Sequence, residues 1–193
     1  PALNVKSVEE LIRLAKSKPG ELNYGSTGVG STAQLVAELF NTTAGIKASH
    51  VPYKGGAPMI AALLANEVHF AFDTPTTVVP MVKDNRLVPL AVTSTERWQA
   101  LPQVKTMDEL GFKGFDATTW FGLLAPRGTP AARVKWLNEN VALTLKDPQI
   151  QQSLGNSGFI VVPSSPQEFA EKIETEGSKW KQTIKAANIR GTQ

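Results

Sequence analysis

Apolar residues along the first hundred positions alternate between short runs and helical spacing. The short runs fit strands, and the stretches between them repeat apolar side chains every three to four positions, as amphipathic helices do. We expect four strands, the first ending near Tyr24 and the others over residues 48–52, 68–72 and 88–92. Strands that alternate with helices form βαβ units, so the pattern predicts an α/β fold with a mainly parallel sheet and flanking helices.

Serine, threonine and aspartate residues mark the starts of several predicted helices. Their side chains accept hydrogen bonds from the free N–H groups of the first helical turn, and a glutamate three positions later completes a capping box. Proline is favoured at the first helical position. The expected starts are Ser7 with Glu10, Thr129 with Pro130, Asp147 with Pro148, and Ser165 with Glu168.

The pattern changes in the second half of the chain. Residues 96–104 are expected to be irregular, and Thr106 with Glu109 to cap a one-turn helix. Two further apolar runs, residues 118–126 and 158–162, predict strands among the later helices.

A loop of glycine and hydroxyl residues joins the first predicted strand to the next helix. Residues 25–32 read Gly-Ser-Thr-Gly-Val-Gly-Ser-Thr. The free N–H groups and the positive dipole end of a helix N-terminus make such a junction an anion site. Glycines let the backbone approach a ligand, and hydroxyl groups add donors. The ligand-binding residues expected in this loop are Ser26, Thr27, Gly28, Gly30, Ser31 and Thr32.

Two phosphate-binding motifs almost fit this loop. Residues 25–32 have P-loop spacing, but Ser31 stands where the lysine that reaches the terminal phosphates is required. Gly28 and Gly30 match a dinucleotide fingerprint, yet residues 48–50 offer no carboxylate for a ribose. A small carboxylate ligand therefore fits better. A phosphate- or dinucleotide-binding enzyme is the alternative, and plain turn chemistry is a second one.

Other polar loops follow the remaining predicted strands. In parallel α/β sheets, ligands bind beyond the carboxyl ends of the strands. Besides the glycine loop, the loops expected there are residues 53–56, 73–74 and 93–94, each with polar residues or glycine. Tyr53 is either a binding residue or part of a surface turn. Asp73, next to Thr74, either caps the following helix or orients a ligand through water.

Composition narrows the class of protein. The net charge of +3 comes from 20 scattered basic residues, which gives no support to nucleic-acid binding. The absence of cysteine excludes disulfides and thiolate chemistry, and is compatible with cytosol or periplasm. No apolar run approaches the roughly 20 residues of a membrane span. Because the chain begins at Pro1 rather than methionine, we expect a processed or engineered start.

Catalysis finds little support in the residues. His50 is expected to be a packed or edge residue, and His69 to point to solvent or a helix. The sequence contains no nucleophile elbow and no pair of histidines at metal-ligand spacing. We therefore expect no catalytic residue, no metal and no cofactor, and interpret the protein as a non-enzymatic binding protein.

Several motifs resemble one family of receptors. Residues 51–58 (Val-Pro-Tyr-Lys-Gly-Gly-Ala-Pro), 90–94 (Leu-Ala-Val-Thr-Ser), 120–126 (Trp-Phe-Gly-Leu-Leu-Ala-Pro) and 128–130 (Gly-Thr-Pro) are similar to the Bug type of solute receptor, the extracytoplasmic binding proteins of tripartite tricarboxylate transporters. The resemblance implies a type II periplasmic-binding-protein fold, in which two α/β lobes close on a small organic acid such as a dicarboxylate. It also implies a periplasmic location and membrane permease subunits as partners.

The same resemblance implies the organisation of this chain and its ligand contacts. Residues 1–119 are expected to be the second lobe, and residues 120–193 the C-terminal part of a first lobe whose N-terminal part is missing. Such a fragment is expected either to self-associate or to be poorly ordered beyond residue 120. The glycine loop would hold one carboxylate while Asp73 and Thr74 order bridging waters, and Gln34 stands where the family often has histidine.

Overall fold

The computed structural model describes residues 3–189 and divides into two compact units, with the boundary between Thr119 and Trp120. The chain leaves the second unit after Gln182, within its last helix. Assignment of these units to receptor lobes stays a prediction. The elements within residues 3–189 are α1 (Val8–Ser17), β1 (Asn23–Ser26), α2 (Thr32–Ala44), β2 (Ser49–Pro52), α3 (Gly56–Leu64), β3 (Phe70–Ala71), α4 (Pro75–Lys83), α5 (Ala131–Thr144), α6 (Pro148–Asn156) and α7 (Pro166–Ala186).

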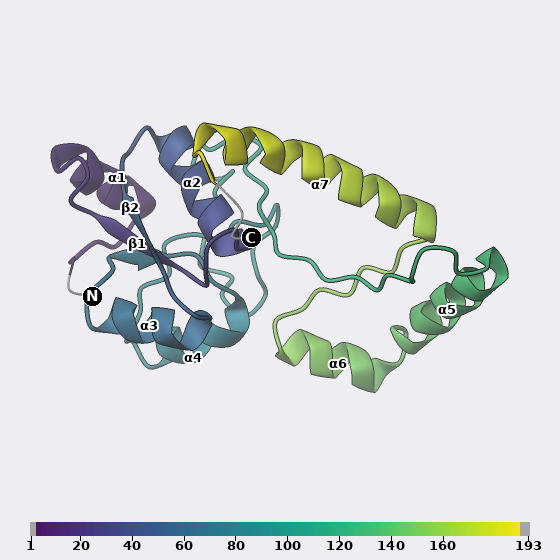
Figure 1. Cartoon of the computed structure of the whole chain (residues 1–193). Coiled ribbons are helices and arrows are strands. Elements are labelled where there is room, and N and C mark those ends of the chain that lie inside the picture. Colours follow the sequence, from purple (N-terminus) through teal and green to yellow (C-terminus); the bar gives the residue numbers. More distant parts are fainter. Residues whose placement is uncertain (1–2, 190–193) are drawn as a thin grey trace. The chain divides into compact units, whose positions relative to one another are not determined.

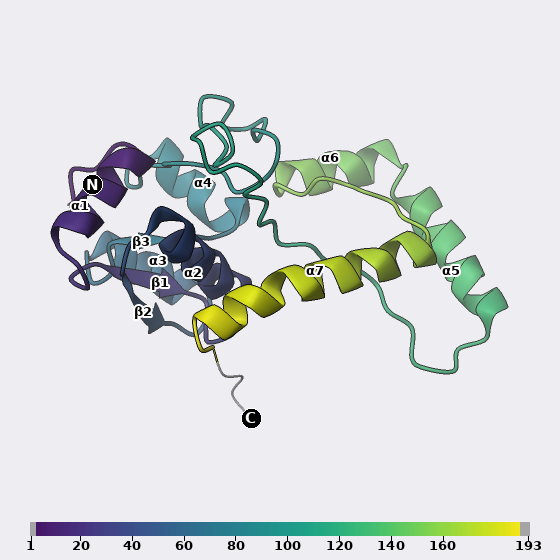
Figure 2. The same ribbon diagram turned by 90° about the horizontal axis from the view of Figure 1, so that it is seen from above.

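The sheet of the first unit is parallel, as the sequence predicts. Its strands lie in the order β2-β1-β3, and Tyr24 of β1 stands opposite His50 of β2 and Phe70 of β3 (Figure 2). The strand order places β1 in the centre. Helix α2 connects β1 to β2, and α3 connects β2 to β3 in the opposite direction across β1. Right-handed crossovers then put these two helices on opposite faces of the sheet, with α4 beside α3 (Figure 1).

The core of the first unit forms between the sheet and these helices. Tyr24, Phe40 and Met59 are each at most 2% exposed, and the Phe40 ring meets Phe70 edge to face at 6.0 Å. Gly25 explains how α3 approaches so closely. A Cβ atom at this position would stand 2.8 Å from Cγ of Met59, so only glycine leaves room for the methionine against β1.

Two of the predicted capping boxes are present, with one variation. Ser7 Oγ accepts from the N–H of Glu10, whose carboxylate accepts from Lys6 N instead of from Ser7. Ser165 and Glu168 cap α7 reciprocally. The predicted N-cap of α5, Thr129, is wrong by one residue. Its N-cap is Pro130, and the preceding Thr129 hydroxyl donates back to the carbonyl of Pro126 instead.

Three predicted strands do not form within residues 3–189. Over residues 88–92, only Val92 makes a bridge, to Thr106, and the backbone of residues 88–91 makes no hydrogen bond within residues 3–189. Residues 118–126 and 158–162 belong to no strand. A strand requires a paired neighbour, and the backbone of residues 120–125 makes no hydrogen bond within residues 3–189.

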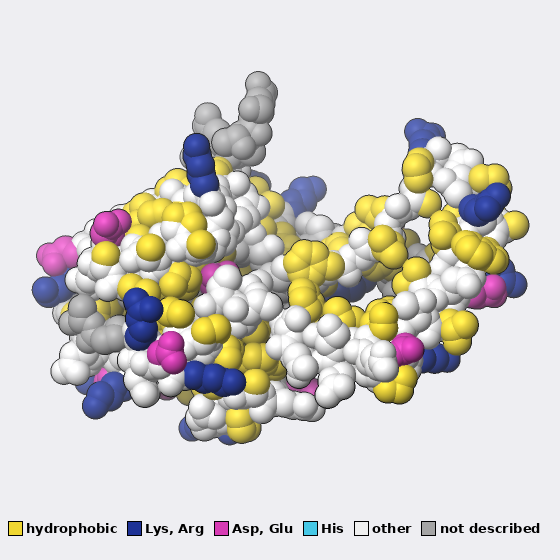
Figure 3. Space-filling view, turned by 90° about the horizontal axis from the view of Figure 1, so that it is seen from below, with side chains coloured by type: hydrophobic (Ala, Val, Ile, Leu, Met, Phe, Trp, Pro, Cys, Tyr) yellow, Lys and Arg dark blue, Asp and Glu magenta, His cyan; other side chains and the backbone are white. Residues whose placement is uncertain are grey.

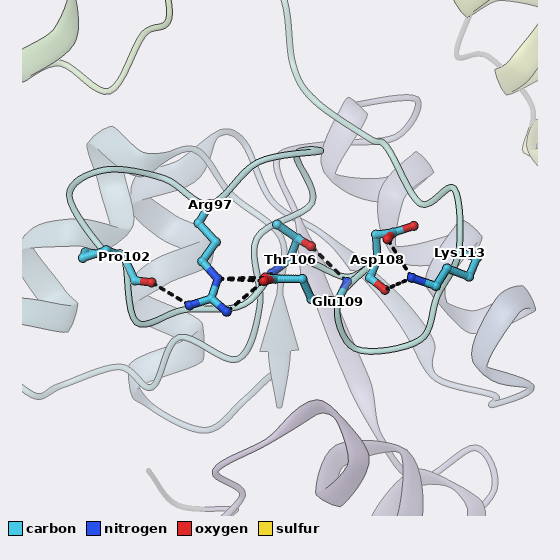
Figure 4. Close-up of polar contacts among 6 residues, drawn as sticks. All are labelled: Arg97, Pro102, Thr106, Asp108, Glu109 and Lys113. Carbon is cyan, nitrogen blue, oxygen red and sulfur yellow. Dashed lines mark hydrogen bonds and ion pairs between the residues drawn. The ribbon is translucent and has the colours of Figure 1, made fainter.

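The irregular segment after residue 95 is held by side chains rather than by a regular element. The predicted one-turn helix is a series of turns, although its capping box is present: Thr106 N donates to the Glu109 carboxylate at 2.8 Å, and Glu109 N donates to Thr106 Oγ1. Arg97 donates to both carboxylate oxygens of Glu109 and to the carbonyl of Pro102 (Figure 4). These contacts lower the pKa of Glu109 to about 2, first through the Arg97 hydrogen bonds.

The second unit has no comparable core. Within residues 118–189 no residue is buried, and Phe121, Leu123, Leu124, Ile160 and Val162 are all more than 70% exposed. Figure 3 shows apolar side chains spread over the surface of this part of the chain, on the right of the view. Its packing consists of edge-to-face pairs, Trp120 with Phe169 and Phe121 with Phe159. In the described part of the chain, no helix combines the length and apolar character needed to span a membrane.

Candidate functional site

Three of the four predicted loops meet at one edge of the sheet. Since β1, β2 and β3 are parallel, the loops that follow them leave at the same edge. A Cβ atom on Gly28 would stand 3.7 Å from the Tyr53 carbonyl oxygen, and one on Gly56 would stand 3.2 Å from a carboxylate oxygen of Asp73. The fourth loop differs because no strand precedes it, and its Thr93 pairs instead with Ala117.

The glycine loop is held together by its own polar side chains. Ser26 Oγ donates to the Gly28 carbonyl at 3.0 Å and accepts from the Gly28 N–H at 3.2 Å. Ser31 is the N-cap of α2, and its hydroxyl donates to the same carbonyl at 2.7 Å. Gln34 Oε1 accepts from Gly30 N at 2.7 Å. Ser26, Ser31 and Gln34 therefore support the backbone of the loop in this structure.

Other donors of the loop have no partner inside the protein. Within residues 3–189, the backbone N–H groups of Thr32 and Ala33 donate to no acceptor, and neither do the hydroxyls of Thr27 and Thr32. Thr32 and Ala33 are the first two residues of α2, so their N–H groups lie at the positive end of the helix dipole. Such an arrangement can bind an anion without a nearby cation.

A row of buried and half-buried side chains follows the loop. Ser26 is fully buried, and its Oγ is 2.6 Å from Nε2 of His50. The imidazole stacks on Tyr24 with 5.0 Å between ring centroids, and the Tyr24 hydroxyl donates to Glu38 of α2 at 2.5 Å. Burial lowers the pKa of His50, opposed by the nearby Glu38 carboxylate, so the imidazole is neutral at pH 7. Burial first, and then Glu38, raise the pKa of Tyr24.

His50 is thus a packed residue, as the sequence predicts, but its contact with Ser26 is not foreseen. Alternation along a strand indicates which face a residue occupies, whereas the partner across the sheet depends on the register. His69 makes a contact that was not predicted. Its Nδ1 accepts from Asn23 N of β1 at 2.8 Å, and the residue is half-buried.

The Asp73 carboxylate is engaged at the start of α4. It accepts from Thr74 N at 2.8 Å and from the Thr77 hydroxyl at 2.6 Å. The N-cap of α4 is Thr74, so Asp73 contacts the start of the helix from the preceding position without being its N-cap. The Thr74 hydroxyl pairs with that of Thr76. Tyr53 is half-buried, and its N–H donates to the carbonyl of Ser26. Ligand contacts of these residues stay a prediction. The described residues include no cluster of three potential metal ligands.

Comparisons with known proteins address the family directly. A family model described as the tripartite tricarboxylate transporter family receptor matches residues 1–189. BugT of Bordetella pertussis is 31% identical over 180 residues, which are 93% of this chain and 55% of BugT. The chain spans about half the length of the curated relatives it matches.

Solved structures agree with this match. The structure of an R. palustris protein with adipate has a TM-score of 0.88 and 38% sequence identity, covering 97% of this chain and 63% of that one. Periplasmic binding protein BugD has a TM-score of 0.84 and 28% identity, covering 98% of this chain and 64% of BugD. The predicted periplasmic-binding-protein fold is confirmed, and the chain belongs to the receptor family of the tripartite tricarboxylate transporters.

Proposed function

We propose that this chain is the carboxylate-binding part of a periplasmic receptor that captures a C4–C6 dicarboxylate for a tripartite transporter. The observation that supports it most directly is the pair of partnerless N–H groups of Thr32 and Ala33 at the start of α2, in a chain of this receptor family. A similar protein has been solved with adipate, a C6 dicarboxylate. The protein binds and releases the acid without converting it.

We propose different roles for the loop residues. The N–H groups of Thr32 and Ala33, with the hydroxyls of Thr27 and Thr32, contact one ligand carboxylate directly. Ser26, Ser31 and Gln34 act through the loop backbone, because their polar atoms already bond to Gly28 and Gly30. Asp73, Thr74 and Tyr53 act at the rim, where Asp73 and Thr74 order bridging waters.

We further propose that residues 1–119 form the second lobe of the receptor and residues 120–193 part of the first. The match to this chain covers 55% of BugT, and the exposed apolar segments of residues 121–125 and 159–162 are the surface that the additional region of such a receptor would cover. The acid bridges the two lobes, closure stabilises the complex, and the closed receptor is recognised by the membrane permease subunits.

The test is a titration of the ¹⁵N-labelled chain with adipate and succinate, read as backbone amide shifts. We expect saturable shifts centred on Thr32 and Ala33 with a millimolar dissociation constant, because half of the donors of a closed receptor are missing. Absence of any saturable shift would refute carboxylate binding at this loop. ATP and NAD in the same titration test the enzyme alternative, and conversion of the added acid over a day would contradict a receptor.

A charge substitution tests the site, and the same charge placed on another helix is its control. Thr32→Asp puts a carboxylate at the first position of α2, where it suits the helix dipole but repels an anionic ligand. We expect adipate affinity to fall at least about tenfold, with the melting temperature unchanged or higher. Gln149→Asp adds the same charge in the first turn of α6, in the other unit, and leaves affinity unchanged. Equal affinity of Thr32→Asp and wild type would refute the site.

A further inference from the structure

The Gly28 carbonyl joins the end of β1 to the start of α2. It accepts from the Ser26 hydroxyl at 3.0 Å, from the Ser31 hydroxyl at 2.7 Å and from the Ser31 N–H at 3.2 Å. Ser26 is the last residue of β1, and Ser31 is the N-cap of α2. The orientation of this one peptide group therefore fixes the first N–H groups of α2 relative to the sheet.

The Ser26 hydroxyl needs a third partner to hold Gly28 in this way. A hydroxyl has one proton and two acceptor lone pairs. The proton goes to the Gly28 carbonyl, and one lone pair accepts from the Gly28 N–H. The remaining lone pair faces Nε2 of His50 at 2.6 Å in a fully buried position. Only an imidazole protonated at Nε2 satisfies all three contacts at once, since an Nδ1-protonated ring would compete with Gly28 for the serine proton.

His50 is itself held in place from α2. Its ring lies on Tyr24 at an interplanar angle of 19°, and Tyr24 donates to Glu38, which also accepts from Asn41 Nδ2 at 3.4 Å. Side chains from β1, β2 and α2 thus form one connected set that ends at the loop. Ser26 and Asn41 of this set are buried, with Asn41 Oδ1 left without a hydrogen-bond partner, whereas His50 and Glu38 are half-buried. Hydrogen-bonded side chains connected in this way favour one conformation of the loop.

We propose that His50 is a positioning residue of the carboxylate site, which it supports by donating from Nε2 to Ser26 and so orienting the Gly28 peptide and the N-terminus of α2. The inference rests on the function proposed above, because it gives His50 a role in the binding of the same acid. His50 does not touch the ligand in this proposal. It sets the direction of the N–H groups that do.

Two substitutions of His50 distinguish the contribution of its hydrogen bond to Ser26 from that of its ring stacked on Tyr24. His50→Phe keeps a flat ring on Tyr24 and removes the donor, whereas His50→Gln loses the ring and keeps an N–H near the position of Nε2. We expect adipate affinity to fall about three- to tenfold in His50→Phe and to recover most of that loss in His50→Gln, although the glutamine variant is the less stable of the two. If His50 had only a structural role, adipate affinity would follow stability. His50→Gln, the less stable variant, would then bind adipate more weakly than His50→Phe.

His69→Phe is the matched control. It also removes one hydrogen bond between a histidine and β1, but at Asn23, the opposite end of the strand from the loop. We expect lower stability with adipate affinity unchanged. In a Ser26→Ala background, His50→Phe should cause no further loss of affinity, because the serine is the only route by which the imidazole acts.

The ¹⁵N spectrum of the imidazole tests the proposal without any substitution. At neutral pH we expect Nε2 protonated and Nδ1 unprotonated, with a shift of the Nε2 signal as adipate binds. An Nδ1-protonated ring, or equal affinity of His50→Phe and wild type, would overturn the role of His50 while leaving carboxylate binding intact. If the wild-type amides do not respond to adipate at all, the proposed function fails first, so the two failures are distinguishable.

Discussion

Helices α2 and α7 are both amphipathic but lie in opposite environments. Helix α2 buries Gln34, Val36, Ala37, Phe40, Asn41 and Ala44, whereas α7, with 21 residues, buries none. The same contrast runs through the two units, because every buried residue among residues 3–189 lies between Val8 and Ala117. An amphipathic helix is stabilised mainly by the apolar surface against which it packs. Helix α2 has such a surface in the core of the first unit, whereas α7 buries no residue.

The difference teaches that the two units depend on different sources of stability. The first unit contains its own sheet, aromatic core and capping contacts. In the second, apolar side chains that would form a core remain exposed, as for Leu123 at 77%. Apolar side chains exposed to this extent commonly contact another segment or another molecule. We therefore expect changes in the core to alter the first unit and changes on the exposed segments to alter association.

The largest expected effect comes from emptying the core. Phe40→Ala removes a ring that is 2% exposed and packs against Phe70 and Phe72, and should lower the free energy of unfolding by about 3–5 kcal/mol. Leu143→Ala, at a side chain 69% exposed in α5, should change it by less than about 0.5 kcal/mol. Urea denaturation measures both, and similar losses would break the comparison between the units.

Next in size is the effect on self-association. We predict that the chain associates through residues 121–125, so its mass in solution exceeds 20.8 kDa at micromolar concentration. Replacing both Leu123 and Leu124 by serine should weaken association by about 3 kcal/mol, roughly a hundredfold, if each is buried on contact. Val88→Ser, a 43% exposed residue of the first unit, is the control. Light scattering that shows a monomer at every concentration would contradict the prediction.

Adding a methyl group at a glycine compares the packing of the two units directly. Gly25→Ala places a carbon 2.8 Å from Met59 Cγ and 3.2 Å from Val68 Cγ2, so α3 or β1 must shift. We expect a loss of about 1–3 kcal/mol in the free energy of unfolding. Gly177→Ala in α7 meets nothing within 4 Å and should leave stability equal or slightly higher, as helix propensity favours alanine. Equal effects at the two glycines would contradict the packing described here.

The smallest expected effect is the change in folding stability at acidic pH. The pKa of Glu109 is depressed from 4.5 to about 2, so its hydrogen bonds with Arg97 and Thr106 stabilise the folded state above pH 4.5. That stability is lost as the pH falls from 4.5 through 2. Because the carboxylate is exposed, the change is small. In Glu109→Gln, stability measured across this range should vary less with pH than in wild type. An unchanged pH dependence would show that the contacts drawn in Figure 4 do not contribute.

Local features were predictable from the sequence, and features that need a distant partner were not. The Ser165 capping box is formed within four residues, and its prediction is confirmed. The strands expected over residues 118–126 and 158–162 require a neighbour, and within residues 3–189 none is paired with them. At the site, alternation of strands and helices predicted the edge where the loops meet. It gave no means to foresee that Ser26 bonds to His50, since that depends on the register of β1 and β2.

The position of the core along the chain has a consequence for synthesis on the ribosome. All residues that are buried among residues 3–189 precede Thr118, so the aromatic core of the first unit is fully synthesised while later residues are still being translated. At about 5–20 residues per second, residues 118–193 take roughly 4–15 s to make. Small α/β domains fold in less time than that. Residues 121–125 follow Ala117 directly and emerge with the core, whereas residues 159–162 and helix α7 are made later. The nascent chain can therefore form its carboxylate loop before α7 is complete, so most of the second unit appears beside a core that is already synthesised.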